Sequence, residues 1–162
     1  VKPSLSPSMD VQISSNFERL LFYVLKEDDK KLSSLMSQLS SKGSFRLDEE
    51  EKKIIKKDFC AYKISDKETL EIIKSFSEKF DFLLDPHTAT AVGASKKVNL
   101  NSEVLILGTA HPYKFLETIK MATNKEVKTP NQLINILNKK EKYDILENKI
   151  SEVKNYILGK LS

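Results

Sequence analysis

The sequence predicts a helix-rich α/β fold with few strands, and two observations support this class. Over most of the 162 residues, apolar side chains recur every three or four positions, which is the spacing of one helix face. By contrast, the apolar residues 104–107 are continuous and end at Gly108, as expected for a strand covered on both faces. Pro112 then suits the first turn of a helix. We therefore expect one strand–turn–helix unit within a largely helical chain.

In the first half of the chain, the pattern predicts three helices and a short strand. Ser15 and Glu18 have the spacing of a capping box. The helix after them should bury four apolar residues: Leu20, Leu21, Val24 and Leu25. A second helix should cover residues 31–39 and end before Gly43, and a third, charged helix over 48–57 should turn Ile54 and Ile55 inward. Residues 59–64 alternate between apolar and polar, which indicates a short strand.

Further helix signals follow in the second half. Ser65 and Glu68 form another capping box before a helix with Leu70, Ile73, Phe76 and Phe80 on one face. The small residues 88–94, after Asp85-Pro86-His87, suit a helix packed closely on its neighbour. Residues 129–132 have the spacing of a third capping box. The last helix should pack against a core through Leu146, Ile150, Val153, Ile157 and Leu161.

Composition excludes several classes of protein. Apolar residues make up 40% and charged residues 31% of the chain, as in globular proteins. The net charge of +4 comes from lysines interleaved with glutamates, which argues against a nucleic-acid partner. Cys60 is the only cysteine, so the sequence offers no disulfide framework and no cysteine zinc site, and we expect a cytoplasmic protein. Residues 20–25 form the longest apolar run, too short to span a membrane.

Thr109 and His111 are the polar side chains at the carboxyl end of the predicted strand. Ligands in open α/β sheets bind at this end of the strands. Gly108 should allow unusual backbone angles or close approach of a ligand. Alternatively, Thr109 bonds the loop backbone and His111 caps a helix. Lys114 in the following helical turn is expected to be a solvated lysine.

Three segments together carry a resemblance to a known family: residues 6–19, with Ser-Pro-Ser-Met-Asp-Val and Ser-Ser-Asn-Phe-Glu-Arg; 85–89, Asp-Pro-His-Thr-Ala; and 108–115, Gly-Thr-Ala-His-Pro-Tyr-Lys-Phe. In this order and at this spacing they resemble the C-terminal part of threonine synthases. These are pyridoxal-phosphate-dependent enzymes of the tryptophan-synthase-like (type II) fold. The resemblance covers residues 2–120, and beyond 122 only the helix pattern agrees. Tyr113 departs from the small residue more usual in the family.

The resemblance implies a reaction and a cofactor. Such enzymes convert O-phospho-L-homoserine and water to L-threonine and phosphate with pyridoxal 5'-phosphate. It places Thr109 against the pyridine nitrogen and makes His111 a second candidate at the cofactor. Asn16 and Arg19 lie in a family motif near the site and are candidates for substrate binding, although a surface ion pair explains Arg19 as well. His87, which follows a proline at a predicted helix start, is expected to be a structural cap rather than a catalytic residue.

The family's Schiff-base lysine lies in a Phe-Lys-Asp segment, which this chain lacks. Its four glycines (43, 93, 108 and 159) are too far apart for a phosphate-binding loop. The chain starts at Val1, and we expect both features upstream, in the same polypeptide. The chain would then be an inactive C-terminal fragment without a catalytic residue or a metal site.

Its expected divisions are a linker (1–15), a mostly helical part (16–100), a strand–turn–helix wall of the cofactor site (101–125) and C-terminal helices (126–162). Two alternatives remain open. The chain could belong to a related pyridoxal-phosphate-dependent phospho-lyase, or it could be a non-catalytic helical interaction module.

Overall fold

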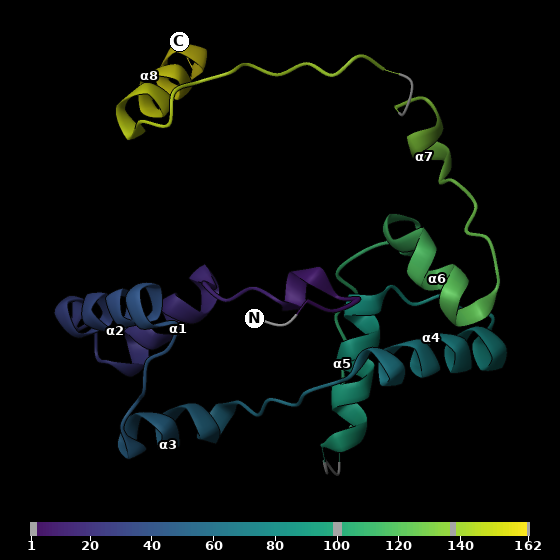
Figure 1. The fold of residues 1–162 in the computed structure, drawn as a ribbon, viewed down its shortest axis with the longest axis horizontal. Helices are drawn as coiled ribbons and strands as arrows, with labels where there is room; N and C mark the ends of the chain where they lie inside the picture. The colour runs from purple at the N-terminus through teal and green to yellow at the C-terminus, as the bar shows by residue number, and fades with distance from the viewer. Residues whose placement is uncertain (1–2, 99–101, 137–138, 162) are drawn as a thin grey trace. The chain divides into compact units, whose positions relative to one another are not determined.

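The structure is a computed structural model that describes residues 3–98, 102–136 and 139–161. The boundary expected at residues 100 and 101 lies outside the described residues, as does Val1. The helical elements are η1 (Pro7–Met9), α1 (Ser15–Val24), α2 (Asp29–Lys42), α3 (Glu49–Asp58), α4 (Asp66–Phe80), α5 (Pro86–Lys97), η2 (Pro112–Phe115), α6 (Leu116–Thr123), α7 (Asn131–Ile134) and α8 (Ile150–Leu161). The chain divides into two compact units, Val1–Lys128 and Thr129–Ser162. Figure 1 shows the ribbon.

Helix α1 packs against α2 and α3. Leu21 and Val24 of α1 are buried, as predicted, and so is Leu25, the residue directly after the helix. Leu20 is only half-buried. The capping box predicted at Ser15 is wrong, because Ser14 is the residue before the first turn. Helix α2 is longer than predicted and ends at Gly43, whose φ of 71° lies in the left-handed region that glycine adopts without strain.

Helix α3 begins with a reciprocal capping box between Asp48 and Glu51. Lys31 of α2 forms ion pairs with both carboxylates. The pKa of Lys31 is raised, chiefly by its hydrogen bond to Glu51. The pKa of Asp48 is lowered, chiefly by the hydrogen bond from the backbone N–H of Glu51. Ile54 was expected to face inward but is 46% exposed, whereas Ile55, also expected inward, is half-buried.

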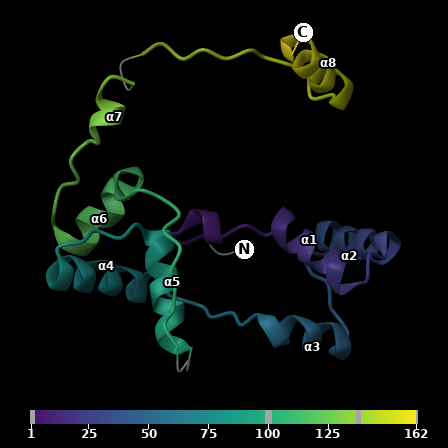
Figure 2. The same ribbon diagram turned by 180° about the vertical axis from the view of Figure 1, so that it is seen from behind.

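Helices α4, α5 and α6 surround the main core, and they lie side by side in both views (Figures 1 and 2). The buried apolar residues of this core are Ile72, Ile73, Leu84, Ala89, Val92 and Ile119. The capping box between Ser65 and Glu68 is confirmed at the start of α4. Phe80, expected on the buried face, is exposed because it lies in the last turn of α4.

The small residues of α5 allow the close packing that was predicted. A Cβ added at Gly93 would lie 2.9 Å from Ile72 Cδ1 and 3.0 Å from Ile64 Cδ1. Such distances are shorter than normal van der Waals contacts, so a larger residue at position 93 would push α5 away from α4.

The two predicted strands are wrong for the described residues: neither 59–64 nor 104–107 is a strand, and no other described residue is. A strand requires hydrogen bonds to a neighbouring strand, and the described residues supply none. In the second segment Ile106 packs against the core, whereas Leu105 is 88% and Leu107 70% exposed. The prediction of a helix-rich part of a larger α/β fold is confirmed, but this segment is covered on one face only.

Gly108 differs from expectation in its backbone. Its φ lies outside the left-handed region, so the turn does not require glycine for conformational reasons. The nearest atom to an added Cβ is the hydroxyl oxygen of Thr88, at 3.9 Å. This distance is an ordinary van der Waals contact, so the described structure would accommodate a Cβ at this position.

The second unit contains α7 and α8. Pro130, rather than Thr129, precedes the first turn of α7, so the third predicted capping box is wrong. The apolar stripe of α8 is present, but Ile150 is 90% and Ile157 52% exposed, so the stripe forms no core with the described residues of this unit. Among the described residues of both units, no helix is long and apolar enough to cross a membrane.

Candidate functional site

The N-terminus of α5 is built around the buried carboxylate of Asp85. Its Oδ1 accepts hydrogen bonds from the backbone N–H of His87 at 2.9 Å and of Thr88 at 3.3 Å. Pro86 occupies the first helical position, where a missing N–H costs nothing. A carboxylate in this position satisfies unpaired donors and interacts favourably with the helix dipole. Asp85 is only 2% exposed, so its charge depends on these protein partners.

His87 links the start of α5 to residues 3–10, the N-terminal segment. Its Nδ1 lies 3.2 Å from Asp85 Oδ1, and its Nε2 accepts a hydrogen bond of 3.0 Å from the backbone N–H of Ser8. Because Nε2 accepts the Ser8 N–H through its lone pair, the hydrogen bond between the ring and Asp85 Oδ1 has Nδ1–H as its donor. The ring also packs at 4.8 Å, between centroids, against Phe115. The expectation that His87 caps the helix is wrong, because the cap is Asp85. His87 instead connects Asp85 to Ser8 through its ring nitrogens.

A second contact ties the N-terminal segment to the same place. The buried hydroxyl of Ser6 donates a hydrogen bond of 3.0 Å to the carbonyl of Pro86. The segments 6–10, 85–89 and 108–115, far apart in the sequence, therefore meet at one end of α5.

Thr88 connects Asp85 to the Thr109 loop. Its hydroxyl donates a hydrogen bond to Asp85 Oδ2 and accepts one from the backbone N–H of Thr109 at 3.4 Å. We did not single out Thr88 from the sequence. The available signal was the Asp-Pro-x-Thr order. It places a threonine three residues after the helix cap, where its backbone N–H and its hydroxyl can each bond one oxygen of the cap carboxylate.

Thr109 itself has an exposed side chain. Among the described hydrogen bonds, none involves its hydroxyl, and only its backbone N–H is engaged. The side of this loop that faces α5 borders a groove of about 380 Å³, lined by Met9, Cys60, Tyr62, His87, Ala91, Ala94, Ser95, Val98, residues 104–107 and Thr109. A neutral hydroxyl at the edge of a mostly apolar groove fits an uncharged aromatic nitrogen, since it can donate to its lone pair.

His111 caps a helix, which is the alternative that the sequence left open for it. Its Nδ1 accepts a hydrogen bond of 3.1 Å from the backbone N–H of Tyr113 and so caps η2. The side chain is exposed and lies two residues beyond Thr109. Lys114 is also exposed, in η2, as expected. His111 therefore fixes the direction in which the chain leaves the Thr109 loop.

The structure does not bring Asn16 and Arg19 to this loop. Both are exposed residues of α1, which packs on α2 and α3. Asn16 Oδ1 accepts the backbone N–H of Phe17 at 2.8 Å, and no described contact joins Arg19 to another side chain. Among the described residues, no group of three potential metal ligands comes together either.

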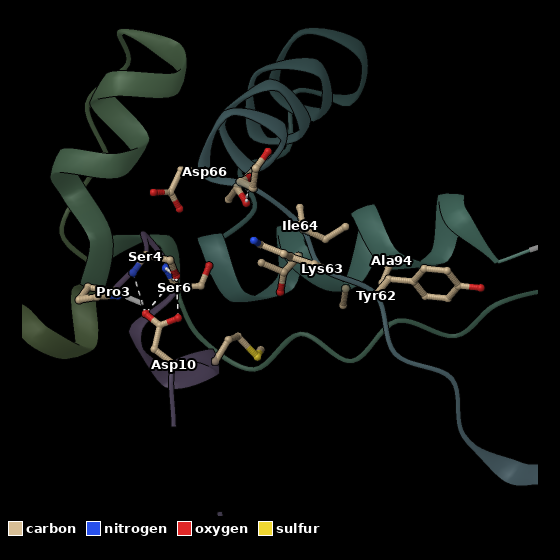
Figure 3. A pocket seen from close by; sticks show the side chains of 14 residues that line it. Pro3, Ser4, Ser6, Asp10, Tyr62, Lys63, Ile64, Asp66 and Ala94 are labelled. Carbon is tan, nitrogen blue, oxygen red and sulfur yellow. Dashed lines mark hydrogen bonds between the residues drawn. The ribbon is translucent and has the colours of Figure 1, made fainter. Parts of the chain in front are cut away.

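A larger pocket, of about 590 Å³, lies where the N-terminal segment meets α4 and α5 (Figure 3). Its carboxylates are both engaged within the chain. Asp10 accepts from the backbone N–H of Ser4 at 2.8 Å and from the Ser4 hydroxyl at 3.0 Å, and Asp66 accepts from the Leu5 N–H at 3.1 Å. The Asp10 bonds close a turn within the N-terminal segment, and the Asp66 bond connects that segment to α4. Neither Thr109 nor His111 borders this pocket.

Comparison with known proteins gives a consistent result. The family described as "Threonine synthase, C-terminal" matches residues 88–157. Threonine synthase from Pseudomonas aeruginosa is 34% identical over 96% of this chain and 34% of its own length. The enzyme from Saccharomyces cerevisiae is 36% identical over 75% of the chain and 27% of its own length.

Solved structures agree with the sequence matches. The crystal structure of PLP-bound threonine synthase from Brucella melitensis has a TM-score of 0.78 and 37% identity, covering 97% of this chain and 34% of that one. Yeast threonine synthase gives a TM-score of 0.75 and 31% identity, covering 99% of this chain and 37% of the yeast chain. The chain thus spans about a third of the length of the relatives it matches. In sequence and in fold, this chain belongs to the threonine synthase family and corresponds to its C-terminal portion.

Proposed function

We propose that this chain is the C-terminal part of an enzyme that converts O-phospho-L-homoserine and water to L-threonine and phosphate with pyridoxal 5'-phosphate. One observation carries the proposal furthest. Residues 6–10, 85–89 and 108–115 of the segments that resemble threonine synthase converge on α5. The loop that they hold presents the Thr109 hydroxyl, which has no hydrogen bond among the described residues, beside a groove. Family membership supports the reaction and the cofactor.

In this proposal pyridoxal phosphate supplies an electron sink for carbanions of the substrate. Thr109 donates its hydroxyl proton in a hydrogen bond to the pyridine nitrogen. Because a hydroxyl is neutral, it orients the ring without drawing a proton onto that nitrogen, which a carboxylate would favour. His111 supports the loop by capping η2 and borders the cofactor site. The site wall corresponds to the division 101–125 of the chain.

The proposal assigns the remaining parts to the same polypeptide. An upstream region supplies the Schiff-base lysine and the phosphate-binding loop, and residues 1–15 connect that region to the helices of 16–100. Asn16 and Arg19 are candidates for binding the substrate phosphate, since a guanidinium matches the geometry of phosphate oxygens. Residues 126–162 form the C-terminal helices. The single cysteine supports a cytoplasmic location for the whole enzyme.

The direct test uses the full-length polypeptide that carries this chain. With O-phospho-L-homoserine and pyridoxal phosphate, it should release phosphate and form L-threonine in equal amounts. Thr109→Val should weaken cofactor binding, whereas Thr109→Ser, which keeps the hydroxyl, should bind normally. The 162-residue chain alone should be inactive. A full-length protein that releases no phosphate would contradict the proposed reaction.

A related phospho-lyase activity is the second candidate. Human "Threonine synthase-like 1" is 34% identical over 74% of this chain and 16% of its own length. The same experiment separates the two candidates, because phosphate release without threonine would indicate the related activity. A full-length protein that neither binds the cofactor nor releases phosphate would favour the non-catalytic module.

A further inference from the structure

We propose that Thr88, supported by Asp85, is a positioning residue that holds the Thr109 loop in the orientation required by the cofactor. This inference rests on the proposed function and deepens it. Thr88 does not face the cofactor. It acts through the backbone of Thr109.

The first step of the argument is the rigidity of Thr88. It lies in the first turn of α5, is 8% exposed, and its backbone N–H is fixed by Asp85 Oδ1. Its hydroxyl proton is committed to Asp85 Oδ2. The direction of the hydroxyl is therefore set by a carboxylate that is itself buried.

The second step is the use of the remaining lone pair. With its proton directed at Asp85, the Thr88 oxygen faces the loop as an acceptor and receives the N–H of Thr109 at 3.4 Å. The bond fixes the backbone of Thr109 and leaves its side-chain hydroxyl unengaged.

The third step is the support of Asp85 on its other side. The His87 ring donates to Asp85 Oδ1, and its Nε2 is held by the Ser8 N–H. Buried polar groups joined in this way have one low-energy arrangement, since any change leaves a donor or acceptor unpaired. A chain of hydrogen bonds therefore runs from the N-terminal segment through α5 to Thr109.

Substitutions at Thr88 in the full-length enzyme test this chain. Thr88→Val keeps the shape but removes both hydrogen bonds, and displacement of the Thr109 hydroxyl should raise the cofactor dissociation constant and lower kcat by about 10- to 100-fold. The KM for O-phospho-L-homoserine should change little. Thr88→Ser keeps the hydroxyl and should restore both values.

Thr90→Val is the matched control. The Thr90 hydroxyl bonds the carbonyl of His87 at 2.7 Å, within the same helix and without contact to the loop. Its removal should leave the cofactor dissociation constant and kcat close to those of the wild type. Thermal unfolding of each variant without cofactor separates loss of folding from loss of positioning.

If Thr88→Val fails to fold, Asp85→Asn provides a second measurement. The amide can keep one oxygen for the helix cap, but its NH₂ group cannot accept the Thr88 proton. It should weaken cofactor binding in the same direction. A foldable variant of either kind that binds cofactor and turns over like the wild type would overturn the inference alone. A wild-type enzyme without cofactor binding or phosphate release would overturn the proposed function, and the inference with it.

Discussion

The start of α5 and the segment 104–107 reverse the usual relation between polarity and burial. Asp85, His87 and Thr88 are polar and nearly inaccessible, whereas Leu105 and Leu107 are apolar and largely exposed. The polar residues tolerate burial because they satisfy one another through hydrogen bonds. The two leucines have no such requirement, and their exposure reflects the lack of a neighbouring surface among the described residues. Burial in this chain therefore follows the partners available to each side chain.

The largest expected effect is at Asp85. Asp85→Ala removes the acceptor of two backbone N–H groups, the His87 ring and the Thr88 hydroxyl, and should lower the free energy of unfolding by about 3 kcal/mol. Urea denaturation measures this loss. Asp48→Ala, which removes the exposed cap of α3, is the matched control and should cost about 1 kcal/mol. Equal losses for the two variants would contradict the importance of the buried network.

Gly93→Ala tests the packing beneath that network. The added methyl would meet Ile72 and Ile64 at about 3 Å, so overpacking should exceed the gain in helix propensity. We expect a net loss of about 1 kcal/mol in the free energy of unfolding. Gly108→Ala, where the nearest atom lies at 3.9 Å, should change stability little. A stabilised Gly93→Ala protein would show that α4 and α5 separate easily.

Glu68 provides an exposed carboxylate for comparison with the buried one. The Lys97 ammonium at 2.8 Å, followed by the Ser65 backbone and hydroxyl, lowers the pKa of Glu68 from 4.5 to about 2. Its stabilising contribution is therefore complete above pH 4.5 and is lost as the pH falls toward 2. The difference in melting temperature between wild type and Glu68→Gln should shrink over this interval. The effect should be small, because solvent screens the pair. A difference that stays constant from pH 6 to pH 2 would contradict it.

The smallest effect is expected at Leu105. Leu105→Ser should change the free energy of unfolding of this 162-residue chain by less than about 0.5 kcal/mol, because the side chain is already exposed. Ile106→Ser, at the neighbouring position that packs against the core, should cost about 1–2 kcal/mol. Differential scanning fluorimetry of both variants is sufficient. A similar loss at both positions would mean that Leu105 is covered in solution.

Local signals in the sequence predicted the helices well. Ser65 with Glu68, and Gly43 after α2, mark helix ends through bonds and backbone angles that neighbouring residues decide. The capping boxes assigned to Ser15 and Thr129 were wrong because the same spacing also occurs one residue away from a true helix start.

Long-range features were harder to predict. The apolar run 104–107 has the composition of a strand, but a strand forms only where a neighbouring strand supplies hydrogen bonds. The sequence of these four residues does not predict whether such a neighbour exists. At the site, Thr109 was identified through its family motif, whereas Thr88 was missed because its importance depends on a contact across 21 residues. Asn16 and Arg19 share a motif with the site residues but not their location in this structure.

The tether between the N-terminal segment and α5 also has a consequence for folding kinetics. The bonds from Ser6 to Pro86 and from Ser8 to His87 close loops of 80 and 79 residues. Closing such a loop is entropically costly. The hydrogen bonds that offset this cost can form only after the start of α5 has folded. We therefore expect the helices to form early and the N-terminal segment to dock late. During synthesis, Ser6 and Ser8 would emerge well before the start of α5 and could reach their final contacts only after it has formed.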